Sequence, residues 1–165
     1  MPGVGKSTIG VILAKILGMN FVDTDLIIQN EKHMLLREII EKEGTDGFIA
    51  VENGINSRLD VKDSVIATGG SIIYGPEAMA NLKKNGDVIY LEQSLSRIEK
   101  RLSNIGNRGV VVKDGQTFAD LYTERCALYE KYADVTVHEG DMDIENTIAE
   151  IRKLMPERDI LAGKA

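Results

Sequence analysis

The sequence has little of several features, and each shortage disfavours a class of protein. It contains one cysteine, Cys126, in 165 residues, so no disulfide can form within the chain. No run of about 18 apolar residues offers a membrane-spanning helix. Its 26 acidic residues outnumber its 20 basic ones, giving a net charge of -6 that disfavours a nucleic-acid partner. We therefore expect a cytoplasmic, monomeric protein that acts on a small molecule, with neither nucleic acid nor membrane as partner.

Strand-like and helix-like segments alternate along the chain. Residues 20–23, 64–68, 87–91 and 134–137 are short, β-branched-rich runs, and helical patterns lie between them at 9–17, 35–43, 46–59, 76–83, 94–102, 117–132 and 144–154. This alternation predicts an α/β fold, with a doubly wound parallel sheet covered by helices on both faces. Its length and 43% hydrophobic content suit one domain over residues 1–155, followed by a polar tail at 156–165.

Residues 103–116 form a segment rich in glycine, asparagine and aspartate between two predicted helices. Such a connection is typical of a lid that closes over a site. A passive surface loop is the alternative.

A phosphate-binding loop is indicated by residues 2–8, which read PGVGKST, the end of the G-x-x-x-x-G-K-[ST] pattern. Its glycines allow backbone amides to face phosphate oxygens, and the helix that follows presents its positive end to them. Lys6 would neutralise the β- and γ-phosphates, and Ser7 would offer its hydroxyl to Mg²⁺. The alternative is a glycine turn before an ordinary helix.

The first glycine of this pattern and the strand that normally precedes it are not in the printed sequence. We favour a natural start upstream of Met1, and a protein that tolerates the gap remains the alternative. The fold prediction is therefore a P-loop kinase sheet that has lost its first strand in this chain.

A pair of acidic residues, Asp23 and Asp25, ends the run at 20–23. Strand alternation predicts that both carboxylates point to the same side. One could hold a metal through water, and the other could orient or deprotonate an attacking hydroxyl. Alternatively, Asp25 only caps the following helix.

The series GVGKSTIG, FVDTD, EGTDGF, ATGG, an arginine-bearing lid and ERCALYEKYAD resembles the shikimate kinase family over nearly the whole chain. The resemblance implies ATP-dependent, Mg²⁺-assisted phosphorylation of shikimate to shikimate 3-phosphate, a step of aromatic amino acid biosynthesis. It also implies a set of site residues. The nucleotide would be bound by Gly3, Val4, Gly5, Lys6, Ser7, Thr8, Arg101 and Arg108. Mg²⁺ would be held by Ser7 and, through water, by Asp23.

On the acceptor side, the resemblance implies that Asp25 meets the substrate hydroxyl, that Gly69 and Gly70 approach the substrate with bare backbone, and that Arg125 clamps its carboxylate. Lys6, Asp25 and Arg108 would be catalytic. Each role has an alternative. Arg101 could be a solvated helix residue, and Arg108 could be an exposed side chain without a function. The two glycines could form a simple turn. Arg125 could pair with Glu124 or Glu130 on the helix surface.

One departure from the family concerns the acceptor, because Ile49 follows Phe48 where the family usually has arginine. Losing one charge-assisted contact weakens carboxylate binding by about ten- to two-hundredfold. On a helix, Ile49 would share a polar face with Glu52, Asn53 and Asn56, and the asparagines could bind hydroxyl or amino groups of a different acid. The alternatives are therefore a kinase of another hydroxy acid such as homoserine, or a nucleotide-binding relative without activity.

Overall fold

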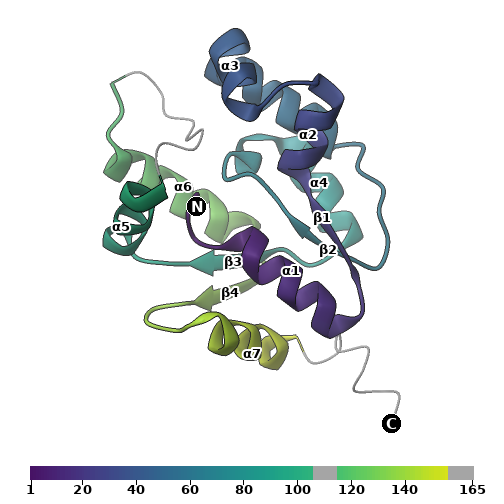
Figure 1. Cartoon of the computed structure of the whole chain (residues 1–165), viewed down its shortest axis with the longest axis vertical. Helices are drawn as coiled ribbons and strands as arrows, with labels where there is room; N and C mark the ends of the chain where they lie inside the picture. The colour runs from purple at the N-terminus through teal and green to yellow at the C-terminus, as the bar shows by residue number, and fades with distance from the viewer. Residues whose placement is uncertain (106–114, 156–165) are drawn as a thin grey trace.

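The computed structural model describes residues 1–105 and 115–155. Most of the predicted lid, including Arg108, and the tail at 156–165 lie outside the described residues. The elements are α1 (Lys6–Leu17), β1 (Asn20–Asp23), α2 (Thr24–Lys32), α3 (Leu36–Asn56), β2 (Ser64–Ala67), the 3₁₀ turn η1 (Ile72–Tyr74), α4 (Pro76–Asn85), β3 (Ile89–Glu92), α5 (Leu95–Ile105), α6 (Phe118–Tyr132), β4 (Val135–His138) and α7 (Ile144–Leu154) (Figure 1).

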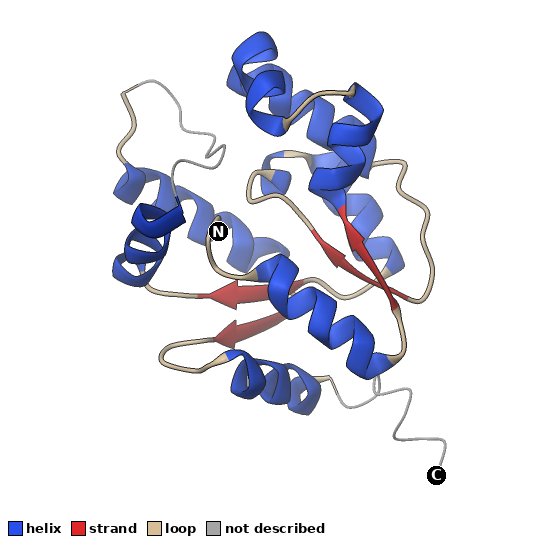
Figure 2. Ribbon diagram, viewed as in Figure 1, coloured by secondary structure: helices blue, strands red, loops and turns tan. Residues whose placement is uncertain are grey.

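Parallel strands form the centre of the molecule. β1 pairs with β2, and β3 pairs with β4, each pair in parallel (Figure 2). The predicted α/β fold with parallel strands is confirmed, and all four predicted strands are present. Within the described residues, however, the strands form two separate two-stranded sheets, and residues 1–5 ahead of α1 contain no strand.

Helices cover both faces of these strands, as neighbouring residues of β3 demonstrate. Tyr90 packs into an apolar cluster with residues of η1, α4, α5 and α6, such as Ile73, Met79 and Ile98. Leu91 packs into a second cluster with residues of α1 and α7, such as Leu13. Because successive side chains of a strand point to opposite faces, the two clusters lie on opposite sides of β3, as the doubly wound prediction requires.

A third apolar cluster joins α2 to α3 through Ile28, Ile39, Phe48 and Ile55. The predicted helices 35–43 and 46–59 form one element, α3, with a kink at Gly44, whose φ is 71°. Ile49 packs against this third cluster. Glu52 and Asn56, which share the helix side of Ile49, are polar but buried, so this side of α3 faces the interior of the molecule.

No helix within residues 1–105 and 115–155 has both the length and the apolar character required to cross a bilayer.

Candidate active site

The phosphate loop is shaped by two glycines with left-handed backbone. Gly3 has φ 74°, and Gly5, the N-cap of α1, has φ 108°. A residue with a Cβ would be strained at either position, so these glycines let the chain turn sharply into the N-terminus of α1. Val4 is 1% exposed and belongs to the apolar cluster under α1. Only its backbone can therefore contact a nucleotide.

Arg101 of α5 forms hydrogen bonds to the main chain of this loop. Its Nη1 donates to the carbonyl oxygen of Val4 at 2.8 Å and to that of Gly3 at 3.5 Å, and it lies 3.7 Å from Oε2 of Glu139. The alternative that Arg101 is a merely solvated helix residue is wrong. The predicted contact with adenine stays a prediction.

Lys6 begins α1, and its side chain turns back over the loop. Its Nζ donates to the carbonyl oxygen of Met1 at 2.8 Å. Burial lowers the pKa of Lys6, and the negative charge of Asp25 opposes that shift. The ammonium group of Lys6 thus lies between the phosphate loop and the carboxylate of Asp25.

The two aspartates take different positions from those predicted. Asp23 ends β1 and caps α2, because its Oδ1 accepts from the backbone amide of Asp25 at 3.0 Å. Asp25 is already in the first turn of α2. The expectation from strand alternation was therefore wrong, and so was the alternative in which Asp25 is the cap.

Asp25 is nevertheless an electrostatic neighbour of Asp23. Burial raises the pKa of the Asp25 carboxyl most, the charge of Asp23 raises it further, and Lys6 lowers it. Its Oδ1 is buried and has no hydrogen-bond partner among the described residues. This carboxylate oxygen is available to an incoming hydroxyl.

Ser7 and Asp23, the residues predicted to hold Mg²⁺, lie side by side. The Ser7 hydroxyl donates to Oδ2 of Asp23 at 2.9 Å, so two oxygen ligands of the type Mg²⁺ prefers are adjacent. Among the described residues, no group of three or more histidine, cysteine or acidic side chains could hold a metal ion. The binding of Mg²⁺ by Ser7 and Asp23 stays a prediction.

Glu52 is a site residue that the sequence interpretation missed. It lies on α3 at 1% exposure, and its Oε2 accepts from the Ser71 hydroxyl at 2.5 Å. Burial raises the pKa of Glu52 to about 7, with Asp25 adding to the rise, while Ser71, Arg125 and Lys6 oppose it. The signal available in the sequence was a glutamate four residues after the buried Phe48, on one face of a helix.

Gly69 and Gly70 bring bare backbone into this cluster, directly after β2. A Cβ on Gly69 would lie 2.2 Å from Oε1 of Glu52 and 2.9 Å from Oδ1 of Asp25. A Cβ on Gly70 would lie 3.1 Å from Cδ of Pro2 and 3.2 Å from Nη1 of Arg125. A side chain at Gly69 would force one of the two carboxylates to move, and one at Gly70 would be tightly packed, because residues from several elements converge on both positions.

Arg125 of α6 closes the cluster. It is 1% exposed, and its guanidinium carbon lies 5.5 Å from the centroid of the Tyr74 ring. Tyr129, one turn later, donates from its hydroxyl to the carbonyl oxygen of Gly70 at 2.6 Å. Arg125 therefore faces the interior, and the alternative of a surface partner for glutamates on α6 is wrong.

The two asparagines of α3 hold α4 in place. Asn53 accepts from the amide of Ala78 at 3.0 Å and donates to Oε2 of Glu77 at 2.7 Å. The Asn56 side chain donates to the carbonyl oxygen of Glu52 at 2.8 Å. Asn53 is thus engaged with α4, whereas the buried Oδ1 of Asn56 has no hydrogen-bond partner among the described residues, and the expected role of the two asparagines in binding substrate groups stays a prediction.

The site combines a loop shaped by glycines at a helix N-terminus with a buried lysine, two acidic groups and a buried arginine. This combination defines the class of protein as a P-loop α/β phosphotransferase.

Comparison with known proteins identifies the family. Residues 2–156 match the family model described as Shikimate kinase. A shikimate kinase of Francisella tularensis subsp. holarctica is 33% identical over 163 residues, which cover 96% of this chain and 93% of that protein. One from Macrococcus caseolyticus is 32% identical over 154 residues, covering 93% of this chain and 91% of the relative. The chain belongs to the shikimate kinase family, as its motifs predicted.

Solved structures agree with this assignment. The chain is similar to the shikimate kinase from Acinetobacter baumannii in complex with shikimate, with a TM-score of 0.85, 30% identity and coverage of 96% of this chain and 90% of that one. It is also similar to the shikimate kinase from Aquifex aeolicus, with a TM-score of 0.79, 27% identity and coverage of 99% and 96%. The P-loop kinase fold and the phosphotransferase class are thereby confirmed.

Proposed function

We propose that this protein transfers the γ-phosphoryl group of ATP to a hydroxyl of shikimate, giving shikimate 3-phosphate and ADP. The observation that carries the proposal is the convergence of Asp25, Glu52 and Arg125 around Gly69 and Gly70, next to the Lys6 ammonium. This convergence supports Asp25 as the base and Arg125 as the cation that binds the acceptor carboxylate, both next to the phosphate loop.

The nucleotide is bound by the loop from Gly3 to Gly5 and by the N-terminus of α1. Backbone amides and the helix dipole favour phosphate oxygens there. Lys6 bonds to the main chain of the loop and interacts electrostatically with Asp25, so it stabilises charge that develops on the transferring group. Thr8, exposed on the first turn of α1, completes the nucleotide side.

Mg²⁺ would be held by Ser7 directly and by Asp23 through water, as their adjacent oxygens allow. When bound, it would neutralise negative charge on the β- and γ-phosphates. Its further ligands would be water and phosphate oxygens.

Asp25 positions the acceptor hydroxyl and takes its proton as the new phosphorus–oxygen bond forms and the bond to ADP breaks. A raised pKa suits this task, since a base accepts protons best when its pKa is not far below the working pH. Arg125 binds the acceptor carboxylate through its fork of donors. Arg108, the third predicted catalytic residue, lies outside the described residues and remains a prediction.

Ile49 bears on how tightly the acceptor binds. With an apolar residue at this position, packed against the cluster that joins α2 to α3, Arg125 is the carboxylate clamp that we assign. We therefore expect acceptor binding to depend strongly on Arg125. A different hydroxy acid such as homoserine is the second candidate acceptor, favoured only by Ile49.

Two variants test these roles separately. Asp25→Asn should lower kcat by about 10²- to 10⁴-fold, the usual contribution of a general base, with ATP binding retained. Arg125→Lys keeps the positive charge but loses the paired N–H donors of the guanidinium group. It should therefore raise KM for shikimate by about tenfold or more while leaving KM for ATP unchanged. Unchanged turnover in Asp25→Asn, or equal changes in both KM values in Arg125→Lys, would contradict the assignment.

A further inference from the structure

The guanidinium group of Arg125 lies inside the fold, against the segment that follows β2. Arg125 is 1% exposed, and its Nη1 would lie 3.2 Å from a Cβ on Gly70. Tyr74, the last residue of η1, belongs to the same segment, and the centroid of its ring lies 5.5 Å from the guanidinium carbon. The group that we assign to the acceptor carboxylate is therefore close to both ends of the stretch 70–74.

Helix α6 holds both ends of this stretch. Tyr129 donates from its hydroxyl to the carbonyl oxygen of Gly70 at 2.6 Å. Tyr74 donates from its hydroxyl to Oε1 of Glu124 at 2.9 Å. Glu124 directly precedes Arg125 on the helix, and Tyr129 stands one turn after it. The two hydrogen bonds therefore flank Arg125 and keep the stretch 70–74 beside its guanidinium group.

Glu124 is fixed in turn, because both of its oxygens accept hydrogen bonds. Oε1 accepts from Tyr74, and Oε2 accepts from Nε2 of Gln116 at 2.7 Å. Burial raises the pKa of Tyr74, hydrogen bonding to Arg125 opposes that rise, and hydrogen bonding to Glu124 adds to it. The Tyr74 hydroxyl thus interacts with the cation on one side and with the carboxylate on the other.

A tyrosine in this place can orient the guanidinium group before the acceptor arrives. An arginine side chain has many rotamers, so a mobile Arg125 would have to be ordered when it binds a carboxylate, at a cost in affinity. A guanidinium group within about 6 Å of an aromatic centroid is attracted by the ring, and the Tyr74 ring meets this distance. The ring therefore favours one orientation of the paired donors of Arg125.

We propose that Tyr74 is a positioning residue for the acceptor: its ring orients the guanidinium group of Arg125, and its hydrogen bond to Glu124 holds the ring in place. The proposal rests on the proposed function only in taking shikimate as the acceptor. It requires no contact between Tyr74 and the acceptor itself, because Tyr74 acts through Arg125.

Two variants separate the ring from its hydroxyl. Tyr74→Phe keeps the ring and loses the hydrogen bond to Glu124, whereas Tyr74→Leu loses both. We expect KM for shikimate to rise by about two- to fivefold in Tyr74→Phe and by about tenfold or more in Tyr74→Leu. KM for ATP should be unchanged in both, because the nucleotide is bound by other groups.

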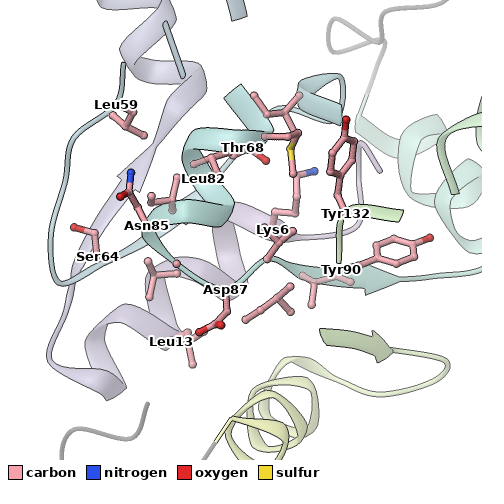
Figure 3. A pocket seen from close by; sticks show the side chains of 18 of the residues that line it. Lys6, Leu13, Leu59, Ser64, Thr68, Leu82, Asn85, Asp87, Tyr90 and Tyr132 are labelled. Atoms are coloured by element: carbon pink, nitrogen blue, oxygen red, sulfur yellow. The ribbon is translucent and has the colours of Figure 1, made fainter. Parts of the chain in front are cut away.

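Tyr132→Leu is the matched control. Tyr132 is the last residue of α6, and a cation, Nζ of Lys131, also lies 5.5 Å from its ring centroid. Its side chain, however, lines the cavity between β2 and β3, as do Ser64 and Tyr90 (Figure 3). We expect both KM values to be those of wild type. An equal rise in KM for shikimate in Tyr132→Leu and Tyr74→Leu would overturn the proposal, because loss of any ring on α6 or beside it would then suffice.

The order of the Arg125 guanidinium group is measured in the same proteins without substrate, by NMR relaxation of its Nε–H group. The signal is assigned by its loss in Arg125→Lys. We expect this group to become more mobile in Tyr74→Leu, and to be as ordered in Tyr132→Leu as in wild type.

Unchanged order of the Nε–H group in Tyr74→Leu would overturn the proposal, and so would an unchanged KM for shikimate in that variant. A wild-type protein that does not phosphorylate shikimate would contradict the proposed function instead. The relaxation measurement would still decide whether Tyr74 orients Arg125, so the two failures are distinguishable.

Discussion

The nucleotide side and the acceptor side of this site are built in different ways. The nucleotide side comes mainly from one short stretch, residues 3–8, and acts through main-chain groups, a helix end and one lysine. The acceptor side is assembled from buried charged groups on α2, α3 and α6, arranged around the glycines that follow β2. The first depends on local backbone shape and the second on tertiary packing, so substitutions should affect them unequally.

Lys6→Ala should have the largest effect, because Lys6 serves both sides. We expect kcat to fall by at least about 10³-fold, since removing a group that stabilises transition-state charge costs several kcal/mol. Steady-state ADP release measures it. Lys15→Ala, at the exposed end of the same helix, is the control and should leave kcat unchanged. Comparable losses in both variants would show that the helix, not the ammonium group, matters.

Gly69→Ala should damage the acceptor side alone. The added methyl group would meet Glu52 Oε1 at 2.2 Å and Asp25 Oδ1 at 2.9 Å, so one of the two carboxylates must move. We expect kcat/KM for shikimate to fall by about 10²-fold, as for a misplacement of about 1 Å in a site, with ATP affinity retained. Gly54→Ala is the control, because nothing lies within 4 Å of its added Cβ. Full activity in Gly69→Ala would mean that the carboxylates are not held in place.

Glu52→Gln should change how stability depends on pH. Burial raises the folded-state pKa of Glu52 to about 7 from an ordinary value of 4.5. Between these two pH values the unfolded chain loses the proton and the folded one keeps it, so the free energy of unfolding falls as pH rises. Below 4.5 and above 7 the contribution is constant. The total fall is roughly 3 kcal/mol at most.

Denaturant unfolding of wild type and Glu52→Gln at pH 4.5 and pH 8 measures this contribution. The variant should lose less stability than wild type across that interval. Glu41→Gln, an exposed position on the same helix, should follow wild type. An identical pH dependence in all three proteins would mean that Glu52 titrates normally in the folded state.

Arg101→Ala should have the smallest effect and should fall on the nucleotide side. It removes the hydrogen bonds to the carbonyl oxygens of Val4 and Gly3, so the loop is less ordered before ATP binds. We expect KM for ATP to rise by about tenfold, equivalent to about 1.4 kcal/mol, with KM for shikimate unchanged. Lys100→Ala, exposed on the same helix, is the control. If KM for shikimate rose instead, Arg101 would contribute to acceptor binding and not to nucleotide binding.

These two sides also differ in how far the sequence could predict them. The phosphate loop, the strand and helix pattern and the acidic pair are local signals, and the fold class and family followed from them. Asp25 was expected to follow strand periodicity from Asp23, but α2 begins at Thr24, so Asp25 lies in a helix and its direction follows helix periodicity. Glu52 was missed because its burial depends on the kink at Gly44 and on Ser71, 19 residues away.

The absence of a strand ahead of the phosphate loop was predicted from the sequence, but the separation of the described strands into two two-stranded sheets was not. Each strand was predicted from its own residues, but pairing is set by which edges meet after the helices pack. Ile49 illustrates the same limit, since its packing against the cluster that joins α2 to α3 depends on tertiary contacts and not on helix periodicity alone.

The most direct test of the central claim is acceptor-dependent ADP release by the unmodified chain with ATP and Mg²⁺. We predict that shikimate stimulates ADP release, that shikimate 3-phosphate forms in equal amount, and that homoserine does not stimulate it. ATP binding without ADP release in response to either acceptor would contradict the claim and indicate a nucleotide-binding relative without kinase activity.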